Sequence, residues 1–406
     1  MGKKTKKRYA NYLKDFRCIG GECEDSCCVG WDIDIDKATF RQYFKVQDQE
    51  MKKMFQKNVH NNENAISSEI DYGRVKLDEG KRCPFLDCKN YCVIHSKLGE
   101  DYLSNVCSSF PRIVNKIDGC YEMSLDVSCP EAARILLGQQ DGIELVDNKE
   151  TLGKHIISSE IDTSLKQFKE SPVKYFKEIR EQSINIIKNR KLDLNKRLHI
   201  LGEFINRLED EFEENPNNVQ KFIRDYEINK VQDENESNDL NYILQVDFFK
   251  KLIGFLKVEK QVESELFKKH TKEIVDAFKL EEGKELSENL EIYKKAFESY
   301  NENCMNKYEY IFENYLVNFM YNNMFPFTES EEMFDGYIML LTRYSFIKFY
   351  LVGKYLNSEE ESKDNITEFI QVFSKVIGHH KTYLVDVLRF LKGREFDNME
   401  FAKIFL

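Results

Sequence analysis

Ten of the eleven cysteines of this chain lie between residues 18 and 129, and only Cys304 stands outside that stretch. They read Cys18-x4-Cys23-x3-Cys27-Cys28, then Cys83-x4-Cys88-x3-Cys92, then Cys107, Cys120 and Cys129. Thiols at such loop-length spacings serve disulfides, zinc sites or iron–sulfur clusters. The chain opens Met-Gly-Lys-Lys-Thr-Lys-Lys-Arg, with no apolar signal segment before the cysteines. We therefore expect a cytoplasmic protein whose reduced thiols bind metal.

Short elements are predicted to position these thiols. The patterns predict a strand at 32–36 and a helix that begins near Lys37, with Asp36 as its N-cap. A loop is predicted at 58–71, followed by a hairpin over 74–86 that turns at Glu79-Gly80. A helix over 98–107 and a strand over 122–127 complete the set. Ser128-Cys129-Pro130-Glu131 predicts a helix start with Ser128 as N-cap and Cys129 at an electropositive terminus that favours a thiolate. Glycines near Cys18–Cys28 let the backbone wrap a metal centre, which Trp31 is expected to cover.

The composition favours long helices in the remainder of the chain. The 406 residues suggest two or three domains, and they include only 18 Gly and 6 Pro. After residue 140 cysteine nearly vanishes and apolar residues recur with the helical period. The predicted fold is mainly α: a small cysteine-rich, metal-binding N-terminal domain (1–140) with minor β-hairpin content, then a larger all-helical domain (141–406).

Three helical segments stand out in the second domain. Residues 201–212 show the spacing of an amphipathic helix, and 243–256 are apolar on most faces, as in a core helix. The most apolar segment, 337–353, contains Arg343 and Lys348 and is therefore predicted to be a buried helix, with both cations reaching outward, and not a membrane span.

The charge distribution argues against nucleic acid as the main partner, because the net charge is −11 and phosphate binding needs clustered cations. Residues 1–17 carry seven cations and one acid. We interpret this arm as a frayed, solvated terminus; the alternative is peripheral docking to an anionic membrane surface or an acidic protein. The sequence leaves the oligomeric state open.

Other residues with chemical potential have simpler interpretations. His95 follows Cys92 by three residues and has metal-ligand chemistry, but a surface histidine is the favoured interpretation. His379 and His380 are also predicted at the surface, and Cys304 as a buried thiol. The chain has no Gly-x-Gly-x-x-Gly motif of a doubly wound fold, and Gly30 stands where a Cys-x3-Cys-x2-Cys radical motif would need its third cysteine.

Residues 16–31, 83–112 and 128–137 resemble the flagellin lysine-N-methylase family. The motifs are Cys18-x4-Cys23-Glu24-Asp25-x-Cys27-Cys28-x2-Trp31, Cys83-x-Phe85-Leu86…Cys92-x-Ile94, Leu103-Ser104-x2-Cys107-x3-Pro111-Arg112 and Ser128-Cys129-Pro130-Glu131-Ala132-Ala133. Later, 313–318 and Phe325-Pro326-Phe327 are also similar. The resemblance implies a methyltransferase that uses S-adenosylmethionine to methylate surface lysines of its partner flagellin.

The resemblance also implies an oxygen-sensitive [4Fe–4S] cluster. The cysteines that match are Cys18, Cys23, Cys27, Cys28, Cys83, Cys92, Cys107 and Cys129, whereas Cys88 and Cys120 are extra. Eight thiols exceed the four that one cubane takes. The sequence therefore allows one cluster with structural thiols, a cluster with zinc, or two centres.

The sequence identifies neither a general base nor a donor site. Methyl transfer requires a neutral lysine amine, because the ammonium has no lone pair. The acidic segments 233–239 and 357–365 are predicted to steer basic substrate surfaces without taking part in chemistry. The alternative function is a non-catalytic interaction protein stabilised by zinc or an iron–sulfur cluster.

Overall fold

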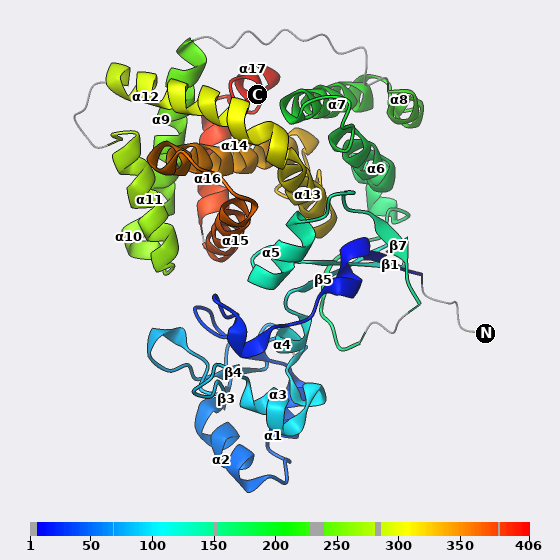
Figure 1. The fold of residues 1–406 in the computed structure, drawn as a ribbon. Coiled ribbons are helices and arrows are strands. Elements are labelled where there is room, and N and C mark those ends of the chain that lie inside the picture. The colour runs from blue at the N-terminus through cyan, green and yellow to red at the C-terminus, as the bar shows by residue number, and fades with distance from the viewer. Residues whose placement is uncertain (1–5, 68, 150–152, 227–238, 281–285, 381) are drawn as a thin grey trace. The chain divides into compact units, whose positions relative to one another are not determined.

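The computed structural model describes residues 6–67, 69–149, 153–226, 239–280, 286–380 and 382–406 (Figure 1). The chain forms two compact units. The first contains residues 1–135 and 144–161, and the second contains residues 136–143 and 162–406. The predicted boundary after residue 140 falls inside the short segment 136–143 that belongs to the second unit.

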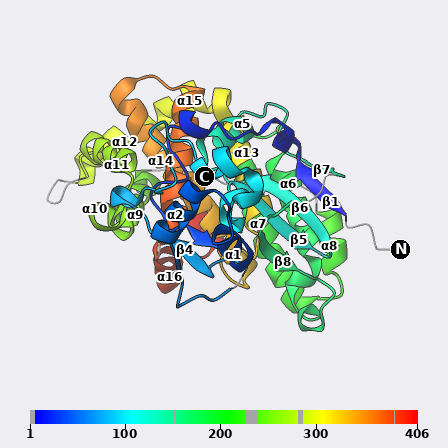
Figure 2. The same ribbon diagram turned by 90° about the horizontal axis from the view of Figure 1, so that it is seen from below.

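A five-stranded sheet organises one part of the first unit. In spatial order its strands are β7 (Leu145–Asp147), β1 (Lys7–Ala10), β6 (Cys120–Leu125), β5 (Arg112–Ile117) and β8 (Ile157–Ile161), which lie side by side in Figure 2. The pairs β1–β6 and β5–β8 are parallel, and β1–β7 and β5–β6 are antiparallel. Asp118 and Gly119 join β5 to β6 with positive φ angles of 48° and 75°, as a two-residue hairpin turn requires. Strand β6 thus confirms the strand predicted at 122–127, although it begins and ends two residues earlier.

The basic arm is not frayed where the structure describes it, so that interpretation was wrong for residues 7–17. Strand β1 buries Tyr9 and Ala10, and the following 3-10 turn (Asn11–Asp15) buries Tyr12. The Tyr12 hydroxyl accepts a hydrogen bond from the backbone N–H of Leu125 at 3.1 Å. The aromatic side chains between the cations drive this burial, which the charge count concealed.

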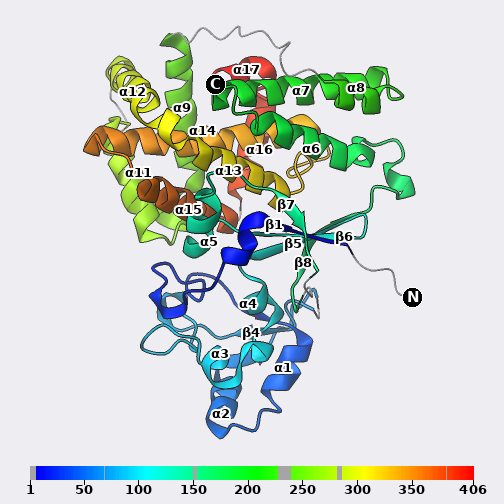
Figure 3. The same cartoon turned by 45° about the vertical axis from the view of Figure 1, so that its right-hand side comes forward.

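The rest of the first unit contains a three-stranded sheet, four short helices and most of α5 (Pro130–Leu137) (Figure 3). The strands of this sheet, in spatial order, are β2 (Asp34–Ile35), β4 (Gly73–Val75) and β3 (Val59–Asn61), and the four short helices are α1 (Lys37–Tyr43), α2 (Gln49–Asn58), α3 (Val93–Leu98) and α4 (Asn105–Ser109). Asp36 caps α1 by accepting from the Thr39 N–H at 2.9 Å, as predicted. The predicted loop at 58–71 is wrong at its start, because β3 extends the chain there and pairs with β4.

The hairpin predicted over 74–86 does not form. Strand β4 pairs with β2 and β3 instead, and residue 82 forms an isolated bridge with Val29. A turn does occur, with Gly80 at φ 68°, but it directs Cys83 back to the first cysteine group. The helix predicted over 98–107 is also wrong: Gly99, at φ 88°, ends α3, and Ser104 caps the separate helix α4.

The second unit is helical. Its helices are α6 (Phe176–Ile187), α7 (Leu194–Glu214), α8 (Val219–Asp225), α9 (Asp239–Leu256), α10 (Val258–Gln261), α11 (Glu265–Ala277), α12 (Leu286–Tyr300), α13 (Asn306–Asn322), α14 (Met333–Ser358), α15 (Lys363–His379), α16 (Tyr383–Gly393) and α17 (Met399–Lys403). Helix α7 confirms the amphipathic helix predicted at 201–212, and α9 confirms the core helix predicted at 243–256. Helix α14 packs against α7, α11, α12, α13 and α15 and forms the centre of this unit. Among the described helices, none is long and apolar enough to cross a membrane.

Arg343 and Lys348 on α14 are buried, so the expectation that they reach outward was wrong. Arg343 donates to Glu329 at 2.6 Å and to the Met339 carbonyl at 3.2 Å. The Lys348 ammonium lies 4.4 Å from the centre of the Phe297 ring. Since neighbouring helices cover α14 on all sides, a long side chain finds its partner inside the unit.

Candidate functional site

The two main cysteine groups converge in the first unit. The backbone N–H of Cys83 donates to the Cys28 carbonyl at 2.9 Å, and the adjacent residues Val29 and Arg82 form an isolated bridge. These contacts bring the 18–28 loop and the 83–92 segment together, although 54 residues separate Cys28 from Cys83. Sequence spacing alone does not specify this pairing.

The convergence rests on a hydrophobic core. Cys83 is buried in a cluster that also contains Tyr43, Phe55 and Phe85, and Cys28 and Cys92 pack against it. Trp31 packs on the same cluster, and its ring meets Phe110 edge-on at 5.2 Å. The elements that carry the thiols thus share a core. Whether Trp31 covers a metal centre stays a prediction.

Most of the eight candidate thiols receive a hydrogen bond at sulfur. Backbone N–H groups donate to Cys18 (from Gly20), Cys23 (from Asp25), Cys83 (from Phe85), Cys92 (from Ile94 and His95) and Cys129 (from Glu131 and Ala132), and the hydroxyls of Ser26 and Ser104 interact with Cys28 and Cys107. The thiol of Cys27 donates to Cys28. Such donors stabilise thiolates and tune the potential of an iron–sulfur cluster.

Hydrogen bonds at sulfur lower the pKa of a thiol, whereas desolvation of the buried thiol raises it. Desolvation raises the pKa of Cys129 to about 12, so burial outweighs the helix N-terminus that was predicted to favour a thiolate at this position. Pro130 begins α5 (Pro130–Leu137), so Cys129 takes the capping position in place of Ser128, and its carbonyl accepts from the Ala133 N–H at 2.8 Å. By contrast, the hydrogen bond from Cys27 lowers the pKa of Cys28 to about 7, with help from Ser26 and Arg82.

The donor chemistry of these eight residues fits an iron–sulfur cluster. All eleven cysteines are free thiols. In the described part of the chain, no three Cys, His, Asp or Glu side chains are arranged to hold a metal ion. A cubane takes one thiolate at each of four irons, so its ligands stand farther apart than those of one ion.

The extra cysteines and the histidines lie in different surroundings. Cys88 is exposed, the Cys120 thiol donates to the Tyr121 carbonyl at 3.9 Å, and Cys304 is buried in the second unit, as predicted. His95 is exposed, in agreement with the surface interpretation. His380 is not a free surface residue: its Nδ1 accepts from the Tyr383 N–H at 3.0 Å, and its Nε2 contacts the Leu256 carbonyl at 2.8 Å.

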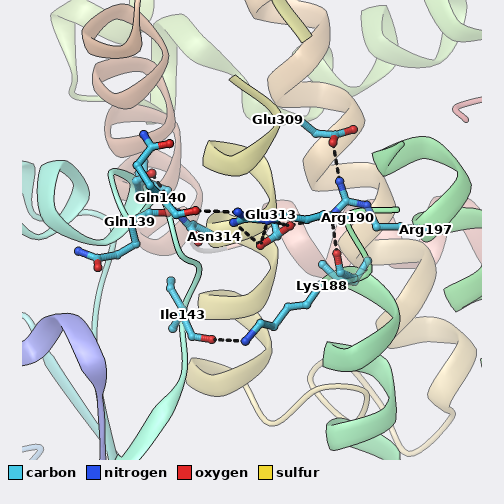
Figure 4. A network of polar contacts seen from close by, with 11 residues as sticks. Gln139, Gln140, Ile143, Lys188, Arg190, Arg197, Glu309, Glu313 and Asn314 are labelled. Carbon is cyan, nitrogen blue, oxygen red and sulfur yellow. Dashed lines mark hydrogen bonds and ion pairs between the residues drawn. The ribbon is translucent and has the colours of Figure 1, made fainter. Parts of the chain in front are cut away.

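A buried ion network forms a second candidate site, within the helical unit (Figure 4). Glu313 on α13 accepts from Arg197 Nη1 at 2.7 Å and from Arg190 Nη2 at 2.9 Å, and Arg197 Nη2 donates to Glu309 at 2.6 Å. The hydrogen bond to Glu313 raises the pKa of Arg190. Because guanidinium groups occupy both oxygens of Glu313, this carboxylate is not available as a general base.

The same network holds the segment 136–143 through its backbone carbonyls. Asn314 Nδ2 donates to the carbonyls of Leu137 at 3.1 Å and Gln139 at 2.7 Å. Arg190 Nη1 donates to Gln140 at 2.6 Å, and Lys188 Nζ donates to Ile143 at 3.2 Å (Figure 4). The network thus fixes a connecting segment of the chain.

Comparison with known proteins identifies the family. The model of the FliB lysine N-methylase C-terminal domain matches residues 180–405, more than half of the chain. The chain belongs to this family. The matched range includes the residues that form the ion network: Arg190, Arg197, Glu309, Glu313 and Asn314. Sequence reasoning missed Arg190, Arg197 and Glu309, whereas Glu313 and Asn314 fell in a motif that resembles the family.

Individual relatives match shorter regions. The flagellar biosynthetic protein FliU of Salmonella muenchen is 32% identical over 151 residues, which cover 36% of this chain and 85% of FliU. The lysine-N-methylases of Salmonella choleraesuis (strain SC-B67) and Salmonella typhimurium (strain LT2) are each 32% identical over 139 residues. Those residues cover 33% of this chain and only a third of each enzyme. No solved structure matches.

Proposed function

We propose that this protein is an S-adenosylmethionine-dependent protein-lysine N-methyltransferase that acts on surface lysines of flagellin. The observation that carries the proposal is the family match over residues 180–405, supported by two relatives named lysine-N-methylase. The name of FliU supports a flagellar substrate.

The reaction is nucleophilic substitution at a methyl group. The substrate ε-ammonium loses its proton, the neutral amine attacks the methyl carbon, the N–C bond forms, and the S–C bond of the donor breaks to leave a neutral thioether. An unperturbed lysine has a pKa of about 10.4, so the site must lower this value or remove the proton. Glu313 does not serve as the base, because two arginines hold its carboxylate.

The proposal includes a [4Fe–4S] cluster held by cysteines of the first unit. The hydrogen bonds at sulfur and the all-thiol donor set support it. A bound cluster would supply the cations that desolvated thiolates need, and it would tie together loops that share only a small core. The cysteines would hold the cluster, and no step of methyl transfer is assigned to them.

Calorimetric titration of S-adenosylmethionine into the anaerobically purified full chain tests the function first. We expect saturable one-to-one binding, and transfer of a radiolabelled methyl group to flagellin. Flagellin with acetylated lysines is the matched control, because acetylation removes the nucleophile and leaves the protein surface in place. Saturable binding of S-adenosylmethionine without methyl transfer would contradict the proposal that flagellin is the substrate. Absence of S-adenosylmethionine binding would favour a non-catalytic interaction protein.

A further inference from the structure

A π-helical segment, Asn301–Met305, joins α12 to α13 in the helical unit. Such segments are rare, and they occur frequently at functional sites. Asn303 of this segment lies at the surface, where its Nδ2 donates to the Ser299 carbonyl at 2.8 Å and contacts the Tyr355 hydroxyl at 3.5 Å. The π-helical segment therefore lies beside the last turns of α14, which contain Tyr355.

Two tyrosines on either side of this segment border the chain that connects α14 to α15. Tyr308 on α13 donates its hydroxyl to the Glu361 carbonyl at 3.2 Å. Tyr300, at the end of α12, is completely buried, and its ring meets the Tyr355 ring edge-on at 5.6 Å. Since Tyr355 is in the last turns of α14 and Glu361 follows that helix, both tyrosines pack on the same short stretch of chain.

The Glu361 side chain is half-buried in these surroundings. Its Oε1 accepts from the backbone N–H of Ser362 at 2.9 Å. Burial raises the pKa of Glu361, although the charge of Lys354 opposes this shift. A carboxylate with a raised pKa is a stronger proton acceptor, as a general base requires. Glu361 thus differs from Glu313, whose two oxygens are held by arginines.

The Tyr300 hydroxyl faces Glu361 and indicates the kind of ligand that fits here. Among the described residues, no group meets normal hydrogen-bond geometry with this buried hydroxyl. Buried polar groups normally have a partner, so a hydroxyl in this state indicates a polar ligand or a water molecule. A primary ammonium has three N–H donors. It can donate to the Glu361 carboxylate and to the hydroxyl oxygens of Tyr300 and Tyr355.

The charges around this site favour a cationic ligand. The titratable groups that face Glu361 are Tyr300 on α12, Cys304 in the π-helical segment, Tyr308 on α13 and Lys354 on α14. The only cation among these four is Lys354, whose pKa is lowered by burial. The exposed acids Glu359, Glu360 and Asp364 lie within a few residues of Glu361 in the chain.

We propose that Glu361, Tyr300 and Tyr355 receive the ε-ammonium of the substrate lysine, and that Glu361 removes its proton. The proton passes from the lysine nitrogen to the carboxylate, and the half-buried acid then releases it to solvent. The neutral amine keeps the lone pair that attacks the methyl carbon. The inference rests on the proposed function and names its general base. It departs from the expectation that the acidic segment 357–365 takes no part in chemistry, and leaves steering to the exposed acids.

Methylation of flagellin by the full-length protein, measured from pH 7 to pH 10, tests the base. Glu361→Gln keeps the size of the side chain and an oxygen for the Ser362 N–H, but it cannot accept the proton. We expect kcat/KM to fall by about 10²–10⁴-fold at pH 7. The deficit should shrink toward pH 10, where more of the substrate lysine is neutral without a base. Glu302→Gln, at an exposed acid of the π-helical segment, is the matched control and should change kcat/KM by no more than about twofold at any pH.

Binding of n-butylammonium, which reproduces the end of a lysine side chain, gives a readout without methyl transfer. It is followed by the resonances of isotope-labelled tyrosines in the full-length protein. Saturable binding is expected, and Glu361→Gln and Tyr300→Phe should each weaken it by at least about tenfold, because each removes a hydrogen bond to a charged group. Glu302→Gln should leave it unchanged. Far-UV circular dichroism confirms that each variant is folded.

Three results separate this inference from the proposed function. A folded Glu361→Gln variant with normal kcat/KM, or with the same deficit at every pH, would overturn the assignment, since a structural role does not depend on ionisation of the substrate. Binding of n-butylammonium that neither variant weakens would overturn it as well. A chain that binds S-adenosylmethionine without methylating flagellin, and that loses n-butylammonium binding in Glu361→Gln, would refute the proposed substrate and support the amine site.

Discussion

Arg197 Nη1 lies 2.7 Å from Glu313 Oε2, and both side chains are almost completely buried, at 1% and 2% exposure. Arg197 also donates to the Ile187 carbonyl at 2.6 Å, at the end of α6. One guanidinium thus joins α6, α7 and α13. A buried charge of this kind contributes little net stability as a pair, but removal of one partner is costly because the other charge stays desolvated.

Replacement of this arginine should destabilise the helical unit. We expect Arg197→Met to lower the free energy of unfolding by about 3–5 kcal/mol, as measured by urea denaturation. Arg207→Met is the control: its exposed pair with Glu203, one helical turn away, should contribute only about 0.3–0.5 kcal/mol. Arg197→Met combined with Glu313→Leu should recover part of the loss. Equal effects of Arg197→Met and Arg207→Met would contradict the structural role of the network.

Lys348 should make stability depend on pH. It is 3% exposed, and desolvation lowers its pKa from 10.5 to about 7 against the opposing charges of Asp193 and Glu309. Between about pH 7 and 10.5 the unfolded chain therefore binds more protons at this residue than the folded chain. Its contribution to the free energy of unfolding must then rise with pH, by up to ~1.4 kcal/mol per unit.

Urea denaturation at pH 7, 8 and 9 measures this effect. The stability of the unsubstituted chain relative to Lys348→Met should increase at each step. Relative to Lys251→Met, which removes an exposed lysine paired with Asp247, it should stay constant. A difference that falls with pH would show that the ammonium form is favoured in the folded state, as its position over the Phe297 ring alone would suggest.

Two pairs of cysteine variants separate metal ligands from other thiols. We expect Cys27→Ser and Cys107→Ser to lose iron, because both residues interact with neighbouring candidate thiols. Cys88→Ser and Cys304→Ser should keep it, since one residue is exposed and the other is buried in the helical unit. Iron per chain after anaerobic purification decides the question. The same loss in all four variants would refute the assignment.

Acidic residues at the junction of α14 and α15 should speed association with a basic substrate. Glu359, Glu360 and Asp364 are exposed, whereas Glu361 is partly buried, and this burial raises its pKa. Replacement of the three exposed acids by amides should lower kcat/KM for flagellin and reduce its salt dependence, with kcat nearly unchanged. A collapse of kcat with unchanged salt dependence would contradict steering. Of the other acidic segment, 233–239, residues 233–238 lie outside the described residues.

Local signals in the sequence were sufficient for several elements. Asp36 was identified as an N-cap because the capping hydrogen bond spans only three residues. The spacing of apolar residues located α7, since a helix buries one face according to its own period, and the apolar character of 243–256 on most faces located α9. The Asp118-Gly119 turn was also a readable local signal and would have identified the β5–β6 hairpin.

Contacts between distant residues set the limit of prediction. Strand β4 pairs with β2 and β3 and not with the segment after its turn, and no local pattern distinguishes these partners. The Tyr12 hydroxyl meets its donor 113 residues later, and Arg197 meets Glu313 116 residues later. In the candidate metal site, the residue types were predictable from the sequence. The convergence of the 18–28 loop with the segment that carries Cys83 required the three-dimensional arrangement.

The segment 136–143 has a consequence for synthesis of the chain on the ribosome. Its Leu137 carbonyl is held by Asn314, which lies 177 residues farther along the chain. At roughly 5–20 residues per second, the segment emerges about ten to thirty seconds before this partner exists. During that interval β7 and β8, which follow the segment, are made and can complete the first unit, whereas Asn314, the partner of the Leu137 carbonyl, has not yet been made. The helical unit therefore closes only after α13 has been made, and a ribosome stalled before that point would release a chain whose first unit alone is complete.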